Sequence, residues 1–170
     1  MFMTLRIAVF CLFSGAAAAV HAADLRPWTG GPPPALALYD LDGRPHRLSD
    51  YRGSVVLINF WATWCGPCRD EMPSIQQLRQ KLAGRPFTVL AVNLDEPEAR
   101  IRRFLATINV DFTILLDPER KVARAWDVRI LPASFVIGPD GKIRYSLVGE
   151  INWGHDLVVS RIAELLPAGK

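Results

Sequence analysis

The sequence predicts an α/β protein built as a three-layer α/β/α sandwich, with helices on both faces of a mixed sheet. Two continuous apolar runs, residues 54–60 and 87–94, are rich in β-branched side chains. Such runs are typical of central strands that are covered on both faces. After the first run, Ile75, Leu78 and Leu82 share one helical face. Alternation of strands with helices, ending in a hairpin and a helix, indicates a single α/β domain.

Residues 1–22 have the pattern of a secretory signal. Arg6 supplies the positive start, an apolar run of about 14 residues follows, and Ala22 offers a small residue for cleavage. The run is shorter than the ~20 residues of a bilayer span. We therefore expect cleavage and export to the periplasm, with an uncleaved membrane anchor as the alternative. Cys11 lies within this segment.

The rest of the chain, about 148 residues, suits one domain with a full core. The formal net charge is +3, or +2 without Arg6. So small a charge gives no argument for nucleic acid or an anionic membrane surface as a partner. We expect a monomer that binds no nucleic acid.

The domain is expected to cover residues 35–170, after a Pro- and Gly-rich linker at 23–34 that is extended and mobile. Residues 35–39 and 45–48 flank an Asp-Gly turn and indicate a β-hairpin. A helix should run from the cysteines to about Leu82, kinked at Pro73. The remaining elements are expected as a strand at 87–94, a helix at 97–107, a strand at 112–116, a short helix at 118–126, strands at 133–137 and 142–148, and a helix at about 155–166.

Cys65 and Cys68 are the only cysteines after residue 22. A bond between them closes a very small loop, so it would stabilise the fold by only about 2 kcal/mol. The pair is therefore better suited to redox work or to metal binding than to stapling the chain.

The position of Cys65 between strand and helix gives the two cysteines different roles. Backbone N–H groups and the helix dipole at a helix N-terminus favour the thiolate. Pro67 suits the first helical turn, where its missing N–H costs nothing. Cys68 comes one turn later and should be more sheltered. We expect Cys65 to attack a substrate disulfide and Cys68 to resolve the mixed disulfide.

Residues 60–68, Phe-Trp-Ala-Thr-Trp-Cys-Gly-Pro-Cys, resemble the active-site motif of thioredoxin. Leu131-Pro132 before the strand at 133–137 matches the cis-proline loop of that family. The N-terminal hairpin, an extra strand–helix segment at about 95–120 and Cys-Arg-Asp-Glu-Met-Pro at 68–73 resemble the exported TlpA/ResA-like branch. The resemblance spans roughly residues 35–166.

The resemblance implies a thioredoxin-like fold and a thiol–disulfide oxidoreductase that reduces client disulfides, in the maturation of cytochrome c or of a copper oxidase. A membrane electron-donor protein would recharge it, with no cofactor besides the Cys65–Cys68 disulfide. It also implies a cis bond before Pro132 and an open backbone at Leu131 for a docked peptide. The residues expected to contact substrate are Trp64, Gly66, Pro67, Leu131 and Pro132, whereas Trp61, Trp126 and Trp153 are expected to pack.

Glu71 is a further candidate, since the exported branch has an acid one turn beyond Cys68. Thioredoxin instead has a buried aspartate where this chain has Asn59. Partial burial would raise the pKa of Glu71 and let it take a proton from Cys68. The alternative is an ordinary solvated carboxylate, which is the expectation for Asp70.

Two other functions use the same cysteines. One is a copper(I)-binding chaperone, which could bind the metal with two soft thiolates. A closed zinc site is less favoured, because it needs four ligands and the positions of His46 and His155 do not have the spacing of zinc ligands. Metal analysis of the purified protein would distinguish a metal-binding function from a redox function of the cysteine pair. A peroxidase of the same fold needs a threonine three residues before its reactive cysteine, where this chain has Ala62.

Overall fold

Parallel pairing of β4 with β5, and of β5 with β6, forms the centre of an eight-stranded mixed sheet, as the apolar runs predict. The computed structural model describes residues 25–168, so the signal or anchor expected at residues 1–22 lies outside the described residues. The strand order is β1-β8-β7-β4-β5-β6-β2-β3, and the five outer strands pair antiparallel. None of the helices formed by residues 25–168 is long and apolar enough to cross a bilayer.

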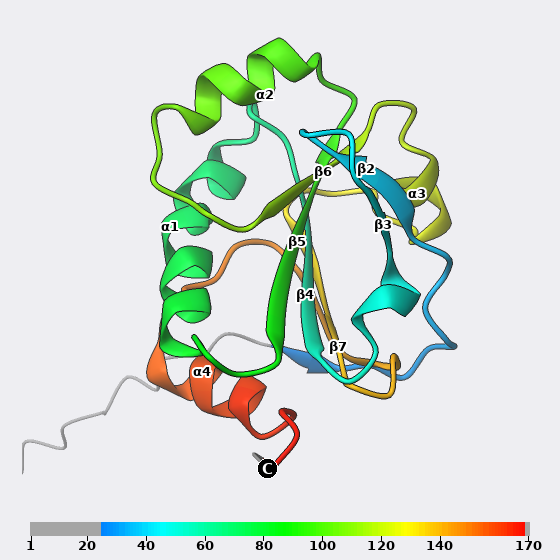
Figure 1. The fold of residues 1–170 in the computed structure, drawn as a ribbon, viewed down its shortest axis with the longest axis vertical. Helices are drawn as coiled ribbons and strands as arrows, with labels where there is room; N and C mark the ends of the chain where they lie inside the picture. Colours follow the sequence, from blue (N-terminus) through cyan, green and yellow to red (C-terminus); the bar gives the residue numbers. More distant parts are fainter. Residues whose placement is uncertain (1–24, 169–170) are drawn as a thin grey trace, which may run out of the picture.

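The elements follow the expected order (Figure 1). The strands are β1 (Arg26–Pro27), β2 (Ala37–Asp40), β3 (Pro45–Arg47), β4 (Val55–Trp61), β5 (Phe87–Leu94), β6 (Thr113–Asp117), β7 (Ala133–Ile137) and β8 (Ile143–Val148). The helices are the 3₁₀ turn η1 (Leu48–Tyr51), α1 (Gly66–Lys81), α2 (Glu98–Leu105), α3 (Lys121–Ala125) and α4 (Asp156–Ala163).

Alternate residues of β4 build the two halves of the core. Val55, Leu57 and Trp61 pack into the cluster that holds the buried faces of α1, α2 and α4. Val56, Ile58 and Phe60 pack into a second cluster that includes α3. Figure 1 shows α1 and α4 on one side of the sheet and α3 on the other. The predicted three-layer sandwich is therefore confirmed, as are the N-terminal hairpin and the extra α2–β6 segment.

The segment expected as an extended linker at 23–34 includes a short strand, β1, in its described part. β1 pairs antiparallel with β8, with Arg26 opposite Ser146. Leu25 is buried, and the Trp28 ring meets the Phe135 ring edge-on at 5.9 Å between centroids. Burial of Leu25 and partial burial of Trp28 hold the segment against the sheet. Pro27 is tolerated because β1 lies at the edge of the sheet.

Pro73 lies inside α1, which is a single helix from Gly66 to Lys81. The neighbouring Ser74 hydroxyl donates to the Glu71 carbonyl (2.7 Å) and accepts from the Trp153 backbone N–H (3.0 Å). These bonds fix the segment after β8 against the middle of α1. The kink predicted at Pro73 stays a prediction.

Candidate active site

The cysteines lie where β4 passes into α1, at the carboxyl end of a central strand. A turn over residues 62–65 closes with a hydrogen bond from the Cys65 N–H to the Ala62 carbonyl (3.2 Å). Cys65 is the N-cap of α1, and Pro67 lies in its first turn. The sulfur of Cys65 thus lies at a helix N-terminus, as predicted, where thiolate charge is stabilised.

Cys65 and Cys68 form a disulfide in the structure, with 5.3 Å between their Cα atoms. Cys65 is 6% exposed and Cys68 is fully buried, so the predicted order of accessibility is confirmed. The Cys68 backbone N–H also points at the Cys65 sulfur (3.3 Å). Of the two cysteines, only Cys65 has any exposed surface.

The neighbours of Cys65 in the chain are exposed. Trp64 is 64% exposed, and Gly66 and Pro67 are also exposed. Trp61 is fully buried against Phe104, at 5.6 Å between ring centroids. The two tryptophans therefore divide as predicted, one towards solvent and one into the core.

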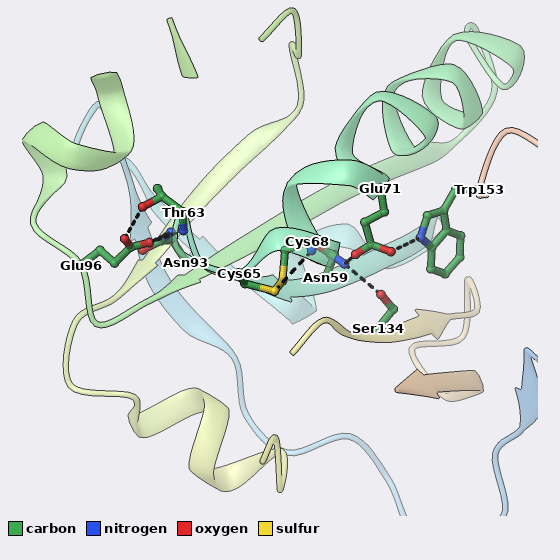
Figure 2. The surroundings of a disulfide bond; sticks show 9 residues. All are labelled: Asn59, Thr63, Cys65, Cys68, Glu71, Asn93, Glu96, Ser134 and Trp153. Carbon is green, nitrogen blue, oxygen red and sulfur yellow. Dashed lines mark hydrogen bonds between the residues drawn. A yellow bond between two sulfur atoms is a disulfide. The ribbon is translucent and has the colours of Figure 1, made fainter. Parts of the chain in front are cut away.

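Glu71 is buried behind the cysteines, although it carries a carboxyl group (Figure 2). Its Oε1 accepts from the Asn59 amide (2.7 Å) and its Oε2 accepts from the Trp153 indole N–H (3.1 Å). The Asn59 amide also donates to the Ser134 hydroxyl (3.0 Å). Side chains from β4, α1, β7 and the segment after β8 therefore meet at this carboxyl.

Burial raises the pKa of Glu71 from 4.5 to about 7, and this effect outweighs the lowering by the bonds from Trp153 and Asn59. Glu150 raises the pKa of Glu71 a little further. The carboxyl can therefore hold or release a proton near neutral pH. Asp70, on the other side of the helix turn, is exposed as expected.

A groove of about 490 Å³ connects Glu71 with the surface. It lies between α1 and the segment that follows β8, and its lining includes Glu71, Ser74, Glu150 and Ile151. Glu71 is therefore a buried residue that borders this groove.

The loop before β7 lies beside β4. The peptide bond between Leu131 and Pro132 is cis, as the motif predicted. Ala133 pairs with Phe60, which places Pro132 level with the end of β4. The Gly149 N–H donates to the Pro132 carbonyl (2.9 Å), whereas the Leu131 backbone bonds to no other described residue. A substrate-binding role for Leu131 and Pro132 stays a prediction.

Several contacts at the site were not predicted from the sequence. Trp153 is buried as expected, but its bond to Glu71 spans 82 positions in the sequence. Ser134 reaches the same network through Asn59. Glu96 accepts bonds from Thr63 across 33 positions. For Glu96 a signal exists, since an acidic residue just after a parallel strand lies at the edge where such sheets carry their sites.

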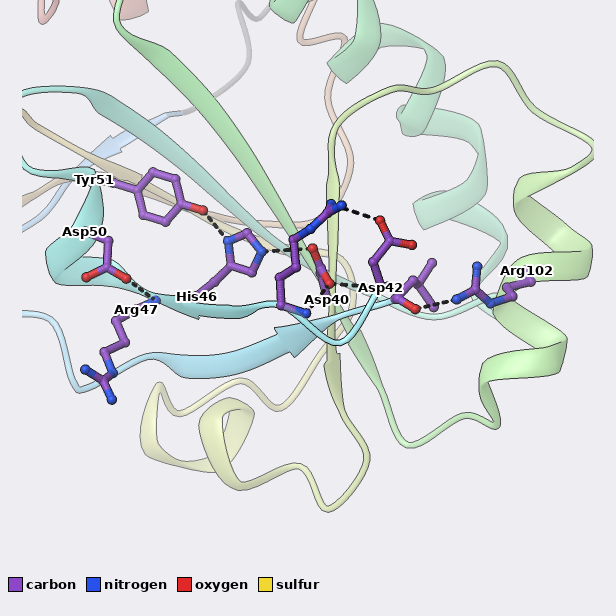
Figure 3. A network of polar contacts seen from close by, with 9 residues as sticks. Asp40, Asp42, His46, Arg47, Asp50, Tyr51 and Arg102 are labelled. Carbon is purple, nitrogen blue, oxygen red and sulfur yellow. Dashed lines mark hydrogen bonds and ion pairs between the residues drawn. The ribbon is translucent and has the colours of Figure 1, made fainter.

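The histidines lie in other networks. His46 bonds Asp40 (3.0 Å) and Tyr51 (2.5 Å) on the β2–β3 hairpin (Figure 3). His155 accepts from the Leu157 N–H at the start of α4 (3.3 Å). Within residues 25–168 no three His, Cys, Asp or Glu side chains gather as metal ligands would.

Comparison with protein families matches residues 29–146 to the AhpC/TSA family. The thiol-disulfide oxidoreductase ResA of Geobacillus thermodenitrificans (strain NG80-2) is 39% identical over 120 residues, which cover 71% of this chain and 69% of that protein. The ResA of Bacillus subtilis (strain 168) is 36% identical over 114 residues, or 67% of this chain and 64% of that protein.

Two solved structures share the fold. A Chlorobium tepidum chain assigned as the thiol:disulfide interchange protein DsbE superposes with a TM-score of 0.74 at 35% identity, over 83% of this chain and 98% of that chain. A thiol:disulfide interchange protein of the thioredoxin family from Chlorobium tepidum TLS gives 0.67 at 29% identity, over 84% and 97%. The thioredoxin-like fold is therefore confirmed.

The raised pKa of Glu71 predicts a pH-dependent stability. In the unfolded chain Glu71 loses its proton near pH 4.5, whereas the folded protein keeps it to about 7. The stabilisation from this group is therefore fully present below pH 4.5 and is lost as the pH rises through about 7. Relative to Glu71→Gln, the parent should lose stability across this window, by on the order of 3 kcal/mol at most.

Urea unfolding of the oxidised proteins at pH 5 and pH 8 measures this difference. Asp70→Asn, which removes the exposed neighbouring carboxylate, is the control and should keep the pH dependence of the parent. Parallel pH dependence of the parent and Glu71→Gln would contradict the prediction.

Proposed function

Since this chain belongs to the AhpC/TSA family and is a thiol–disulfide oxidoreductase with the thioredoxin-like fold, we propose that it works as an exported reductant of client disulfides. The observation that carries the proposal is the arrangement of a slightly exposed cysteine at a helix N-terminus, a fully buried cysteine one turn later and a buried carboxyl beyond both. The secretory pattern of residues 1–22 supports export. A membrane electron-donor protein would supply the reducing equivalents that the periplasm lacks.

The reduced protein begins the reaction through Cys65. Its thiolate attacks one sulfur of the client disulfide, a mixed disulfide forms, and the other client sulfur leaves as a thiolate that takes up a proton. The helix N-terminus stabilises the attacking thiolate. Trp64, Gly66 and Pro67 flank Cys65 in the chain and would contact the client, and the free backbone of Leu131 beside Pro132 would offer hydrogen bonds to the client segment.

Cys68 then resolves the mixed disulfide. It must lose its proton inside the protein, and Glu71 on the same helix is the group that we propose receives it. The Cys68 thiolate attacks the Cys65 sulfur, the second client sulfur leaves as a thiolate that takes up the second proton, and the Cys65–Cys68 disulfide forms. The client has gained two electrons and two protons, and the membrane donor returns the same number to the cysteine pair.

The clients that we propose are exported proteins whose cysteines later take haem or copper, in the maturation of cytochrome c or of a copper oxidase. The resemblance of residues 68–73 and of the α2–β6 segment to the exported TlpA/ResA-like branch supports this class. Such clients must present reduced thiols before they can receive the cofactor.

The direction of electron flow is tested by equilibration in glutathione redox buffers. A Gly-Pro pair between the cysteines is typical of reducing proteins near about −270 mV rather than of oxidants near about −120 mV. We expect the Cys65–Cys68 disulfide to stay oxidised in buffers that fully reduce a strong oxidant. Reduction of the pair in the same buffers as a strong oxidant would contradict the proposed reductant function.

The two cysteines should differ in reactivity. The helix N-terminus should lower the pKa of Cys65, whereas no such stabilisation reaches buried Cys68. Alkylation of the reduced protein near neutral pH, followed by peptide mapping, should therefore label Cys65 first. Faster labelling of Cys68 would show that the roles are reversed.

Trp64 should matter for protein clients and not for small disulfides. Trp64→Ala should slow the reduction of a protein disulfide such as that of insulin by about fivefold or more, because an exposed aromatic anchor is lost. Reduction of a small aromatic disulfide should be unchanged. Tyr39→Ala is the matched control, since Tyr39 is 62% exposed against 64% for Trp64. Equal slowing by the two substitutions would rule out a specific contact.

A further inference from the structure

Glu96 is a second buried carboxyl beside the cysteines, placed on the opposite side from Glu71 in Figure 2. It follows β5, and its side chain is only 1% exposed. Its Oε2 accepts from the Thr63 backbone N–H (2.6 Å) and from the Asn93 amide (2.9 Å), and its Oε1 accepts from the Thr63 hydroxyl. Both oxygens are therefore occupied by donors from the ends of two neighbouring parallel strands.

Thr63 belongs to the turn that delivers Cys65. The turn starts at Ala62, immediately after β4, and ends at Cys65, which caps α1. Glu96 binds Thr63 through both its backbone and its side chain, so the middle of the turn is fixed from outside. The residue after Thr63 in this turn is the exposed Trp64.

Glu96 does not cap α2, the helix that it precedes. It stands just before Pro97, the N-cap of α2, where a carboxylate often bonds the first free N–H groups of a helix. α2 has no side-chain cap, and the Glu96 side chain turns back to Thr63 and Asn93 instead. Burying a carboxylate costs stability unless donors compensate it, and here the compensating donors belong to the active-site turn and its neighbouring strand.

We propose that Glu96 is a positioning residue for the thiol chemistry, which through Thr63 fixes the turn of residues 62–65 and holds the Cys65 sulfur at the N-terminus of α1. The inference rests on the proposed role of Cys65 as the attacking thiol. Glu96 touches neither sulfur through a hydrogen bond, so it acts on reactivity by geometry. The hydroxyl that a peroxidase of this fold would need at Ala62 is absent, and that of Thr63 is engaged with Glu96.

Other charged groups near Glu96 and the turn lie on α1 and α2 and in the loop before α2, where the exposed Asp95 directly precedes Glu96. Arg100 on α2 is 3.9 Å from Glu96 Oε1, and its side chain is 62% exposed. Arg69 on α1 lies over the Phe104 ring, 5.9 Å from its centroid. Asp70 is exposed, and Glu71 is buried on the far side of the disulfide. A change at Thr63 leaves all of these charges in place.

The test is the pH dependence of Cys65 alkylation by iodoacetamide in the reduced protein, with the labelled residue identified by peptide mapping. Thr63→Val removes the hydroxyl without changing any charge. It should move the midpoint of alkylation to higher pH and slow the reaction at pH 7 by about fivefold, as expected when bonds to a charged group are weakened. Thr63→Ser keeps the hydroxyl and should stay within about twofold of the parent.

Glu96→Gln should shift the midpoint in the same direction as Thr63→Val, because a glutamine cannot accept at both positions. Simple loss of a nearby negative charge would shift it the other way, towards easier thiolate formation. Glu98→Gln is the matched control, since it removes a carboxylate two positions away that is 50% exposed and paired with Arg102. It should leave the midpoint at the parental value.

A lower midpoint in Glu96→Gln, or a parental profile in Thr63→Val, would overturn the inference. If Glu96→Gln fails to fold, the contrast between Thr63→Val and Thr63→Ser decides it. First labelling of Cys68 in the parent would overturn the assignment of the nucleophile instead, which is a different result from unaltered profiles in the Thr63 variants.

Discussion

The Glu71 carboxyl is removed from water between α1 and the sheet, and the arrangement of the site depends on how that burial is compensated. A carboxylate without partners in this position would cost several kcal/mol. Asn59 from β4 and Trp153 from the segment after β8 each donate one hydrogen bond to it. The donors are too few to keep the pKa of Glu71 at its ordinary value, so burial prevails and raises it to about 7. The same contacts hold three segments of the chain around Cys68.

Two buried carboxyls thus flank one disulfide with different surroundings. Glu71 lies one helical turn after Cys68 and borders a groove, and its pKa of about 7 suits it to taking up and releasing a proton. Glu96 is bonded by Thr63 and Asn93 at the ends of two strands, so it is suited to fixing backbone. We therefore propose that Glu71 accepts the proton of the resolving thiol, Cys68, and that Glu96 fixes the turn that leads to the attacking thiol, Cys65.

The fold and the order of the two cysteines could be predicted because they follow from local patterns. The apolar runs of β4 and β5, the turn residues of the hairpin and the Cys-Gly-Pro-Cys motif each specify structure within a few neighbouring positions. The side-chain pairs could not be predicted, because Trp153 meets Glu71 and Glu96 meets Thr63 only after the strands are assembled. Asn59 is an example. From the sequence it is only the position where thioredoxin has an aspartate and this chain does not, whereas in the structure its amide donates a hydrogen bond to Glu71. β1 was missed because two residues, one of them proline, give no strand pattern.

The most direct test of this account is a titration of the Glu71 carboxyl itself in the oxidised protein. Carbon-13 NMR of labelled glutamate follows its protonation, and the Glu71→Gln variant identifies the signal. The account predicts a midpoint at about pH 7. A midpoint at the ordinary value of 4.5 would contradict it, because the Glu71 carboxylate would then be too weak a base to hold a proton from Cys68 near neutral pH.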